Sequence, residues 1–268
     1  MRDDHLAPHV HCAAVIKGAL NIGVGVTGTV ASMSDQRARA IYALKYAGPF
    51  TVYAGYNVWQ WDMATEEFEL ENWYLWCVRG DGPTVVVDTG ADPELTRSRK
   101  QSDRFENPVN VLARLDVDAA EVEHVVLSHL HWDHAGGVHL FPNARFYVQQ
   151  AEWEFWTADP IAARRPFANL TDPASIEHLK SLEGTDRLRV ISGDREIVPG
   201  IECLHAPGHT PGQQAVAVDD TAAGRAILGS DCAHTFRNYR YDWPSAFSMD
   251  LAACLRSYAK LKAAASAI

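Results

Sequence analysis

The stretch HVVLSHLHWDHAGGV, residues 124–138, decides the fold and indicates its chemistry. Its aliphatic residues predict a buried strand, and His129, His131, Asp133 and His134 follow that strand directly. In extended backbone, side chains two positions apart share a face, so His129 and His131 can bind one ion together. Asp133 and His134 come in the next turn and can reach a neighbouring ion. The stretch therefore predicts a metal site at a strand end, with two divalent ions about 3.5–4 Å apart.

Two later segments have a matching character at the ends of other predicted strands. His209 stands in the turn APGHTPG (206–212), and Asp231 ends the apolar run of ILGSDCAH (227–234). Imidazole nitrogens and carboxylate oxygens are ligands of zinc and similar ions. A single histidine in a turn is more often solvated, but three such segments at successive strand ends indicate one shared site. We expect the carboxylate of Asp231 to bridge the two ions.

The pattern of apolar and turn-forming residues around these segments predicts an α/β fold. The expected elements are strands at 38–47 and 51–62, a hairpin within 71–90, a helix at 109–122, a strand running into a helix at 144–156, a loop or helical excursion at 157–187, and three strand-like stretches after it. A last helix begins at Asp250, with an apolar face of Leu251, Cys254, Leu255, Tyr258 and Leu261. This order of elements predicts two packed sheets with helices outside.

Length and composition limit the function classes. The chain has 268 residues, of which 47% are hydrophobic and 22% charged, as in an ordinary globular protein. The net charge of −10 disfavours nucleic acid and anionic membranes as partners. The sequence has no run of 18 apolar residues that would predict a membrane-spanning helix. Five scattered cysteines without a CxxC pair suit reduced thiols, so we expect a cytoplasmic protein.

The first residues predict a segment separate from the fold. Residues 13–31 are apolar and rich in glycine, but Lys17 interrupts them, and Asp3 and Asp4 are unlike the positive start of a signal peptide. We expect a poorly ordered extension over residues 1–32 and one folded domain over residues 33–268. Export, and a translation start at Met33, are the alternatives.

Four segments together resemble a known family. SHLHWDHAGG, with VVVDTG upstream and APGHTPG and GSDC downstream, resembles the metallo-β-lactamase superfamily from about residue 70 to residue 260. The resemblance implies an αββα sandwich with a dinuclear site, usually zinc, at one edge of the sheets. It also implies that residues 33–268 form a metallo-β-lactamase-like hydrolase domain.

The resemblance also implies a set of ligands. The matching positions are His129, His131 and His209 for the first ion, and Asp133, His134 and the bridging Asp231 for the second ion. Asp88 of VVVDTG resembles a family aspartate that supports a ligating histidine from behind. We expect the cofactors to be two divalent metal ions, with Zn²⁺ as the metal.

Within the superfamily, SHLHWDHAGG…APGHTPGQQ…SDCAHTFRN is most similar to the N-acyl homoserine lactonases, the quorum-quenching branch. This implies that a hydroxide bridging the two metals opens the ring of an N-acyl homoserine lactone or a similar lactone. Asp133 or Asp231 would carry the proton to the leaving oxygen. The expected partner is then a small-molecule lactone. The sequence is also compatible with a homodimer. Thioester hydrolases of the glyoxalase II type share the ligand set and are the alternative.

Two departures from the family pattern bear on the site. The family has a last histidine ligand in a turn after the final helix, whereas no histidine follows His234 here. The alternatives are a second ion that lacks a ligand, a fragment without its last strand, and a non-catalytic metal-binding protein. His234 also stands where related lactonases have a tyrosine that contacts the lactone, so we predict a catalytic role for it. It would donate to the carbonyl or leaving group; a substitute ligand and an ordinary polar neighbour are the alternatives.

Several aromatic residues are candidates for the pocket wall. They are Trp59, Trp61, Phe68, Trp132, Trp153 and Trp156. We expect at least half of them to pack in the core or in loops instead. Trp132, which lies between the ligands, is expected nearest the substrate. Cys232 is expected to be a small packed thiol, because its neighbour Asp231 already fills the bridging position.

Overall fold

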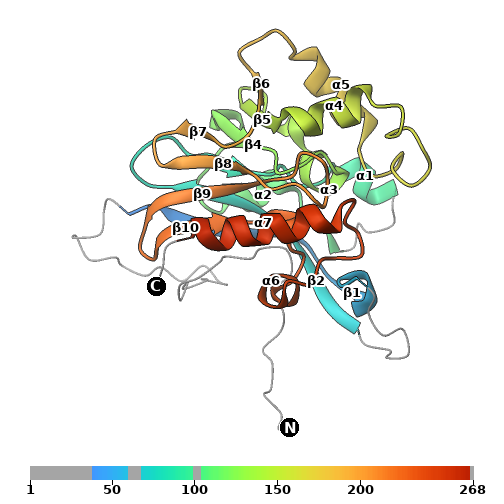
Figure 1. The fold of residues 1–268 in the computed structure, drawn as a ribbon. Helices are drawn as coiled ribbons and strands as arrows, with labels where there is room; N and C mark the ends of the chain where they lie inside the picture. Colours follow the sequence, from blue (N-terminus) through green and yellow to red (C-terminus); the bar gives the residue numbers. More distant parts are fainter. Residues whose placement is uncertain (1–37, 60–67, 99–103, 266–268) are drawn as a thin grey trace.

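The computed structural model describes residues 38–59, 68–98 and 104–265, and these form two β-sheets with helices on both outer sides (Figure 1). The predicted extension over residues 1–32 lies outside this range. In the described ranges, no helix combines the length and the apolar character needed to cross a membrane.

The first sheet has the strand order β1-β2-β3-β4-β5-β6. Its strands are β1 (Ala40–Tyr53), β2 (Phe68–Arg79), β3 (Val85–Val87), β4 (His124–Val126), β5 (Arg145–Gln149) and β6 (Leu188–Ile191). The pairs β1–β2 and β2–β3 are antiparallel, and β3 to β6 run parallel. The carboxyl ends of parallel strands meet at one edge of a sheet. That edge therefore brings together Asp88, which follows β3, and the histidine motif, which follows β4.

The second sheet is antiparallel, with the order β10-β9-β8-β7. Its strands are β7 (Arg195–Val198), β8 (Ile201–His205), β9 (Gln214–Thr221) and β10 (Gly224–Leu228). The segment with His209 connects β8 to β9, and Asp231 follows β10. Because Leu228 at the end of β10 pairs with Val216 at the start of β9, these two segments lie at the same edge.

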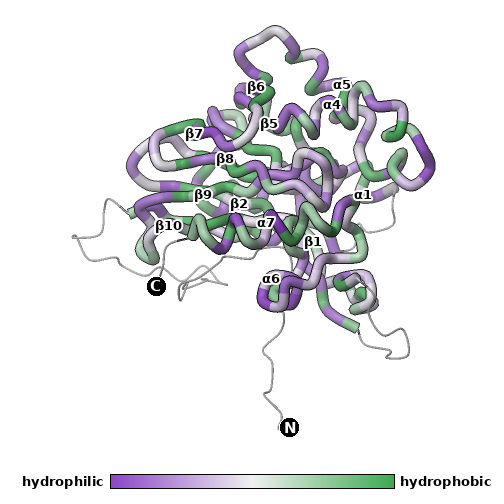
Figure 2. The backbone as a smooth tube through the Cα atoms, in the orientation of Figure 1, coloured by the Kyte–Doolittle hydropathy of each residue, from purple (hydrophilic) through white to green (hydrophobic). Residues whose placement is uncertain are grey.

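Alternating side chains build three apolar layers. In β3, Val85 and Val87 face the second sheet, while Val86 packs on the helical side. In β9, Val216 and Val218 face the first sheet, and Ala215 and Ala217, which alternate with them, pack in the layer under the last helix, α7 (Leu251–Ala264). Figure 1 shows α7 across the second sheet, and in Figure 2 its hydropathy alternates along its length. The αββα sandwich is confirmed.

The helices are short apart from α7. They are α1 (Pro93–Ser98), α2 (Pro108–Ala113), α3 (Trp132–Ala135), α4 (Gln150–Ala158), α5 (Pro173–Ser181) and α6 (Phe236–Tyr241). Asp250 caps α7 as predicted, accepting a hydrogen bond of 2.8 Å from the Ala253 N–H. Leu255 is 43% exposed, so its assignment to the apolar face is wrong. The buried stripe runs through Cys254, Tyr258 and Leu261, and Leu255 lies one residue, about 100°, away from it.

Three predicted elements differ from the fold. The strands expected at 38–47 and 51–62 form one strand that ends at Tyr53, and residues 54–56 form a 3-10 turn; residues 60–62 lie outside the described range. The helix expected at 109–122 ends at Ala113, because Asp116 adopts a φ of 54°, which a right-handed helix does not continue through. The hairpin of β2 and β3 and the passage from β5 into α4 are confirmed.

Candidate metal centre

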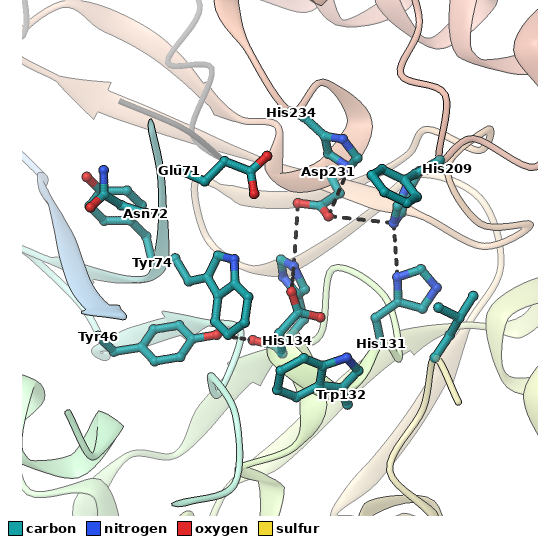
Figure 3. Close-up of a pocket in the computed structure, with 14 residues that line it drawn as sticks. Tyr46, Glu71, Asn72, Tyr74, His131, Trp132, His134, His209, Asp231 and His234 are labelled. Atoms are coloured by element: carbon teal, nitrogen blue, oxygen red, sulfur yellow. Dashed lines mark hydrogen bonds and ion pairs between the residues drawn. The ribbon is translucent and has the colours of Figure 1, made fainter. Parts of the chain in front are cut away.

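The loops at this shared edge line a cavity of about 280 Å³ (Figure 3). Six of the residues singled out from the sequence line it: His131, Asp133, His134, His209, Asp231 and His234. His129 lies just beneath them, fully buried, with its ring centroid 4.2–4.8 Å from those of His131, His134 and His209. Residues up to 105 positions apart in the sequence, from His129 to His234, thus meet at one end of the sandwich.

The first group consists of His129, His131 and His209. One ring nitrogen of each lies within 4.8 Å of those of the other two, and Nδ1 of His131 is 3.0 Å from Nε2 of His209. Two nitrogens on one zinc ion are about 3.3 Å apart, given bonds of about 2.0–2.1 Å. Nε2 of His129 is buried and has no hydrogen-bond partner among the described residues. A buried polar atom left in this state costs free energy, so this group fits an ion.

The charge state of these imidazoles favours the same conclusion. Burial, reinforced by the neighbouring imidazoles, holds the pKa of His129 and His131 well below the usual range. Burial also lowers the pKa of His209, to about 3, although Asp231 opposes this shift. All three rings are therefore neutral at pH 7. A neutral ring has a nitrogen lone pair to give to a metal.

The second group surrounds Asp231. Its Oδ1 is 3.4 Å from Nε2 of His134, and its Oδ2 is 3.6 Å from Nε2 of His209. One carboxylate oxygen thus faces each half of the centre, as bridging requires. Asp133 is more distant, with its Oδ2 3.7 Å from Nε2 of His134. Burial lowers the pKa of His134, but the carboxylates of Asp231, Asp133 and Asp88 outweigh it and raise that pKa well above the usual value.

Asp88 holds the second group from behind. Its Oδ2 accepts hydrogen bonds from Nδ1 of His134 at 2.8 Å and from the Ser230 hydroxyl at 3.2 Å. Both of its oxygens accept from Ser128, the backbone N–H at 2.7 Å and the hydroxyl at 2.9 Å. Ser128 precedes His129, and Ser230 precedes Asp231. Asp88 therefore links the three segments of the predicted ligands His129, His134 and Asp231 and leaves Nε2 of His134 facing the centre.

Replacing Asp88 with asparagine is expected to weaken binding of the second ion by roughly 10–100-fold. The amide brings N–H groups toward the donors that the carboxylate now satisfies, so the orientation of His134 is lost. Asp116→Asn is a matched control, because Asp116 also has a positive φ but is exposed. Titration of each variant with zinc against a competing chelator measures the effect, and equal affinities would contradict it.

Close packing of two glycines brings the histidine motif against Asp88. A Cβ on Gly137 would lie 2.5 Å from the carbonyl oxygen of Thr89, and a Cβ on Gly136 would lie 2.2 Å from that of Trp132. Real Cβ atoms do not approach oxygen so closely. The turn that carries Asp133 and His134 therefore reaches its place only with glycine at these positions.

His234 reaches the centre from the segment before α6. Its Nε2 is 3.2 Å from Oδ2 of Asp231, and its ring centroid is 5.1 Å from that of His209 and 6.0 Å from that of Phe247. Burial lowers the pKa of His234, but Asp231 and then Glu71 outweigh it and raise that pKa. His234 lines the cavity and also groups with His209 and Asp231 as a third set of close ligand atoms. The geometry is compatible with both a substrate contact and a ligand.

Sequence reasoning missed several cavity residues. Tyr46 donates a hydrogen bond of 2.5 Å from its hydroxyl to the backbone carbonyl of Asp133. Trp73 contacts Trp132 edge to face, with 5.2 Å between centroids, and Glu71 also lines the cavity, with its carboxylate toward Asp231 and His234 in Figure 3. Glu71 and Trp73 are two positions apart on β2, so strand periodicity could have paired them.

The predicted wall residues divide into three kinds. Trp132 lines the cavity as expected. Trp153 and Trp156 are buried in the core, and Trp156 contacts the predicted ligand His131 edge to face. Trp59 and Phe68 are 43% and 61% exposed and are not among the residues that line the cavity, and Trp61 lies outside the described residues. Cys232 is buried, as expected of a packed thiol.

Comparison with known proteins agrees with this architecture. The model of the metallo-beta-lactamase superfamily matches residues 68–265. An N-acyl homoserine lactonase of Bacillus sp is 32% identical over 215 residues, which cover 72% of this chain and 77% of the relative. The N-acyl homoserine lactonase AttM of Azorhizobium caulinodans is 31% identical over 149 residues, covering 55% of each chain. The chain belongs to the metallo-β-lactamase superfamily.

Solved structures share the fold. An N-acyl homoserine lactone hydrolase with N-hexanoyl-L-homoserine bound at its catalytic metal centre superposes with a TM-score of 0.66 at 22% identity, covering 85% of this chain and 88% of the other. The dizinc quorum-quenching lactonase AidC gives a TM-score of 0.64 at 20% identity, covering 83% and 81%. At sequence identities of 20–22%, the similarity to these structures shows a shared fold alone.

Proposed function

We propose that the protein is a dinuclear metal-dependent lactonase that opens the ring of N-acyl homoserine lactones. One observation carries the proposal: ligand residues from three strand-end segments converge at one cavity, in a chain 32% identical to a relative named as such a lactonase. The assignment of these residues as ligands, and the domain spanning residues 33–268, are part of the same proposal.

The bound ions would lower the pKa of water toward about 7 and polarise the lactone carbonyl. In this proposal His129, His131 and His209 hold the first ion through neutral imidazoles. Asp133, His134 and Asp231 hold the second, and Asp231 spans both. Tyr46 fixes the turn of Asp133 through its backbone carbonyl, so the Asp133 carboxylate is placed to carry a proton to the oxygen that leaves the opened ring.

The cavity walls fit the two halves of such a substrate. Trp73 and Trp132 form an edge-to-face aromatic pair that offers apolar surface to an acyl chain. His234 lies on the opposite side of the centre, beside Asp231, in Figure 3. We propose that its raised pKa keeps a proton on the ring for a hydrogen bond to the lactone carbonyl or leaving oxygen.

The identity of the metal, the cellular location and the partners are proposed together with the activity. The donor set of imidazoles and carboxylates suits zinc as the metal. The scattered cysteines without a CxxC pair suit a cytoplasmic enzyme, and the net charge of −10 disfavours a nucleic acid or anionic membrane partner. A homodimer is compatible with the proposal and is tested by the mass of the protein in solution.

A panel of substrates tests the function. The zinc-loaded protein is expected to hydrolyse N-hexanoyl and N-decanoyl homoserine lactone with a kcat/KM at least about tenfold above that for a thioester such as S-lactoylglutathione, a preference of about 1.4 kcal/mol in the transition state. His131→Ala is the control and is expected to abolish turnover. Faster thioester cleavage, or lactone cleavage that His131→Ala leaves intact, contradicts the proposal.

A further inference from the structure

A second buried carboxylate, Glu152, lies outside the metal centre. It stands in the first turn of α4 with 0% of its surface exposed. Its Oε1 accepts hydrogen bonds from the Leu130 backbone N–H at 2.9 Å and from the Trp156 indole N–H at 2.7 Å. Its Oε2 accepts from the Thr210 hydroxyl at 2.6 Å and from the Gly212 backbone N–H at 3.0 Å. Four donors thus fill the four acceptor positions of one carboxylate.

Three of these donors belong to the segments that carry the first group of histidines. Leu130 lies between His129 and His131. Thr210 follows His209 in the connection between β8 and β9. The remaining side-chain donor, Trp156, contacts His131 edge to face, with 5.6 Å between ring centroids. One carboxylate therefore joins the two loops across which Nδ1 of His131 and Nε2 of His209 face each other at 3.0 Å.

The fit around Glu152 leaves little freedom. A Cβ on Gly212 would lie 2.1 Å from the backbone nitrogen of Glu152 and 2.4 Å from its Cβ, so the His209 loop packs directly on the start of α4. A buried charge is stable only while its hydrogen bonds are all formed. A shift of the His209 loop would break the two bonds from Thr210 and Gly212, and a shift of the His129–His131 loop would break the bond from Leu130. The carboxylate thereby resists any change in the separation of the loops.

We propose that Glu152 is a positioning residue that fixes the separation of the His129–His131 and His209 loops and so sets the affinity of the first metal ion. The proposal rests on the metal site of the proposed function. It requires only that the site binds ions, whichever substrate is cleaved. Glu152 acts through Leu130 and Thr210 and touches neither ion nor substrate.

Glu152→Gln is the direct test. The amide keeps the size of the side chain. In either orientation, its NH2 group replaces an oxygen that accepts two hydrogen bonds, so an N–H donor faces two other donors. We expect the affinity for the first Zn²⁺ to fall by at least about tenfold in competition with a chelator, since supporting residues of metal ligands contribute roughly 10–100-fold. The visible spectrum of Co²⁺ in the site is expected to change as well, because it reports ligand geometry.

Glu154→Gln is the matched control. Glu154 lies on the same helix two residues later, is exposed, and its carboxylate accepts a hydrogen bond of 2.6 Å from the Gln150 amide, so the same substitution there is expected to leave zinc affinity and the cobalt spectrum unchanged. Thr210→Val removes one donor without changing the size of the side chain. If Glu152→Gln does not fold, Thr210→Val decides the question, with a smaller loss of zinc affinity expected.

The outcomes separate positioning from a general effect on stability. A lower melting temperature in Glu152→Gln with an unchanged zinc affinity and an unchanged cobalt spectrum overturns the proposal, and so does an unchanged affinity in Thr210→Val. Neither readout depends on hydrolysis. A wild-type chain that binds two ions but cleaves no lactone refutes the proposed function, while loss of affinity in Glu152→Gln still supports the role of Glu152.

Discussion

Asp231→Asn is expected to reduce lactone hydrolysis by more than about a hundredfold, which exceeds the roughly 10–100-fold expected for a residue that only supports a ligand. The reason is its position. One oxygen faces His134 at 3.4 Å and the other faces His209 at 3.6 Å, so the residue serves both halves of the centre. An amide offers one oxygen and no negative charge, and cannot serve both ions. The measurement is kcat/KM together with the number of zinc ions bound per chain.

Asp220→Asn is the control for this substitution. Asp220 lies near the end of β9, in the second sheet. Its side chain is 77% exposed, and its ion pair with Arg39 at 3.6 Å is of the weak surface kind. We expect this variant to keep both ions and full activity. An Asp231→Asn protein that still binds two zinc ions and hydrolyses lactone at the wild-type rate would remove Asp231 from the centre.

Local spacing in the sequence was sufficient to predict which residues meet at the candidate metal centre. His129 and His131 are two positions apart after a buried strand, and their rings lie 4.4 Å apart, as residues on one face of an extended segment should. His209 and Asp231 were found because each follows an apolar run and strand ends meet at a sheet edge. Each ligand thus belonged to a short pattern that a single sequence displays.

Long-range packing explains what the sequence did not reveal. Tyr46 meets the carbonyl of Asp133 across 87 positions, and Glu152 meets Gly212 across 60. Nothing beside Tyr46 or Glu152 in the sequence marks either residue as part of a site. The Asp133 carbonyl and the Gly212 N–H are backbone groups, which are not specific to a residue type, so no pattern of residue types records these two contacts. The helix predicted at 109–122 failed for a related reason, since Asp116 satisfies helical spacing while its backbone turns left-handed.

Zinc is expected to raise the melting temperature of the metal-free protein by about 8–16 °C for each ion bound. An ion at about 1,000 times its dissociation constant contributes about 4 kcal/mol, and a chain of this size gains about 2–4 °C per kcal/mol. The physical sources are a buried nitrogen without a hydrogen-bond partner and a set of carboxylates held close to one another. Nε2 of His129 is buried without a partner among the described residues, and the carboxylates of Asp88, Asp133 and Asp231 crowd around His134.

Thermal unfolding with zinc and with excess chelator measures this difference, and elemental analysis of the same samples gives the ion count. His131→Ala is the control and is expected to lose most of the gain from the first ion, because two of three imidazoles hold it weakly. Two bound ions per chain, together with the full expected rise in melting temperature, would mean that the second ion is retained. Its ligands would be His134, Asp133 and Asp231, completed by His234 or by water. A melting temperature that zinc leaves unchanged would contradict a folded, high-affinity centre and with it the proposed hydrolysis.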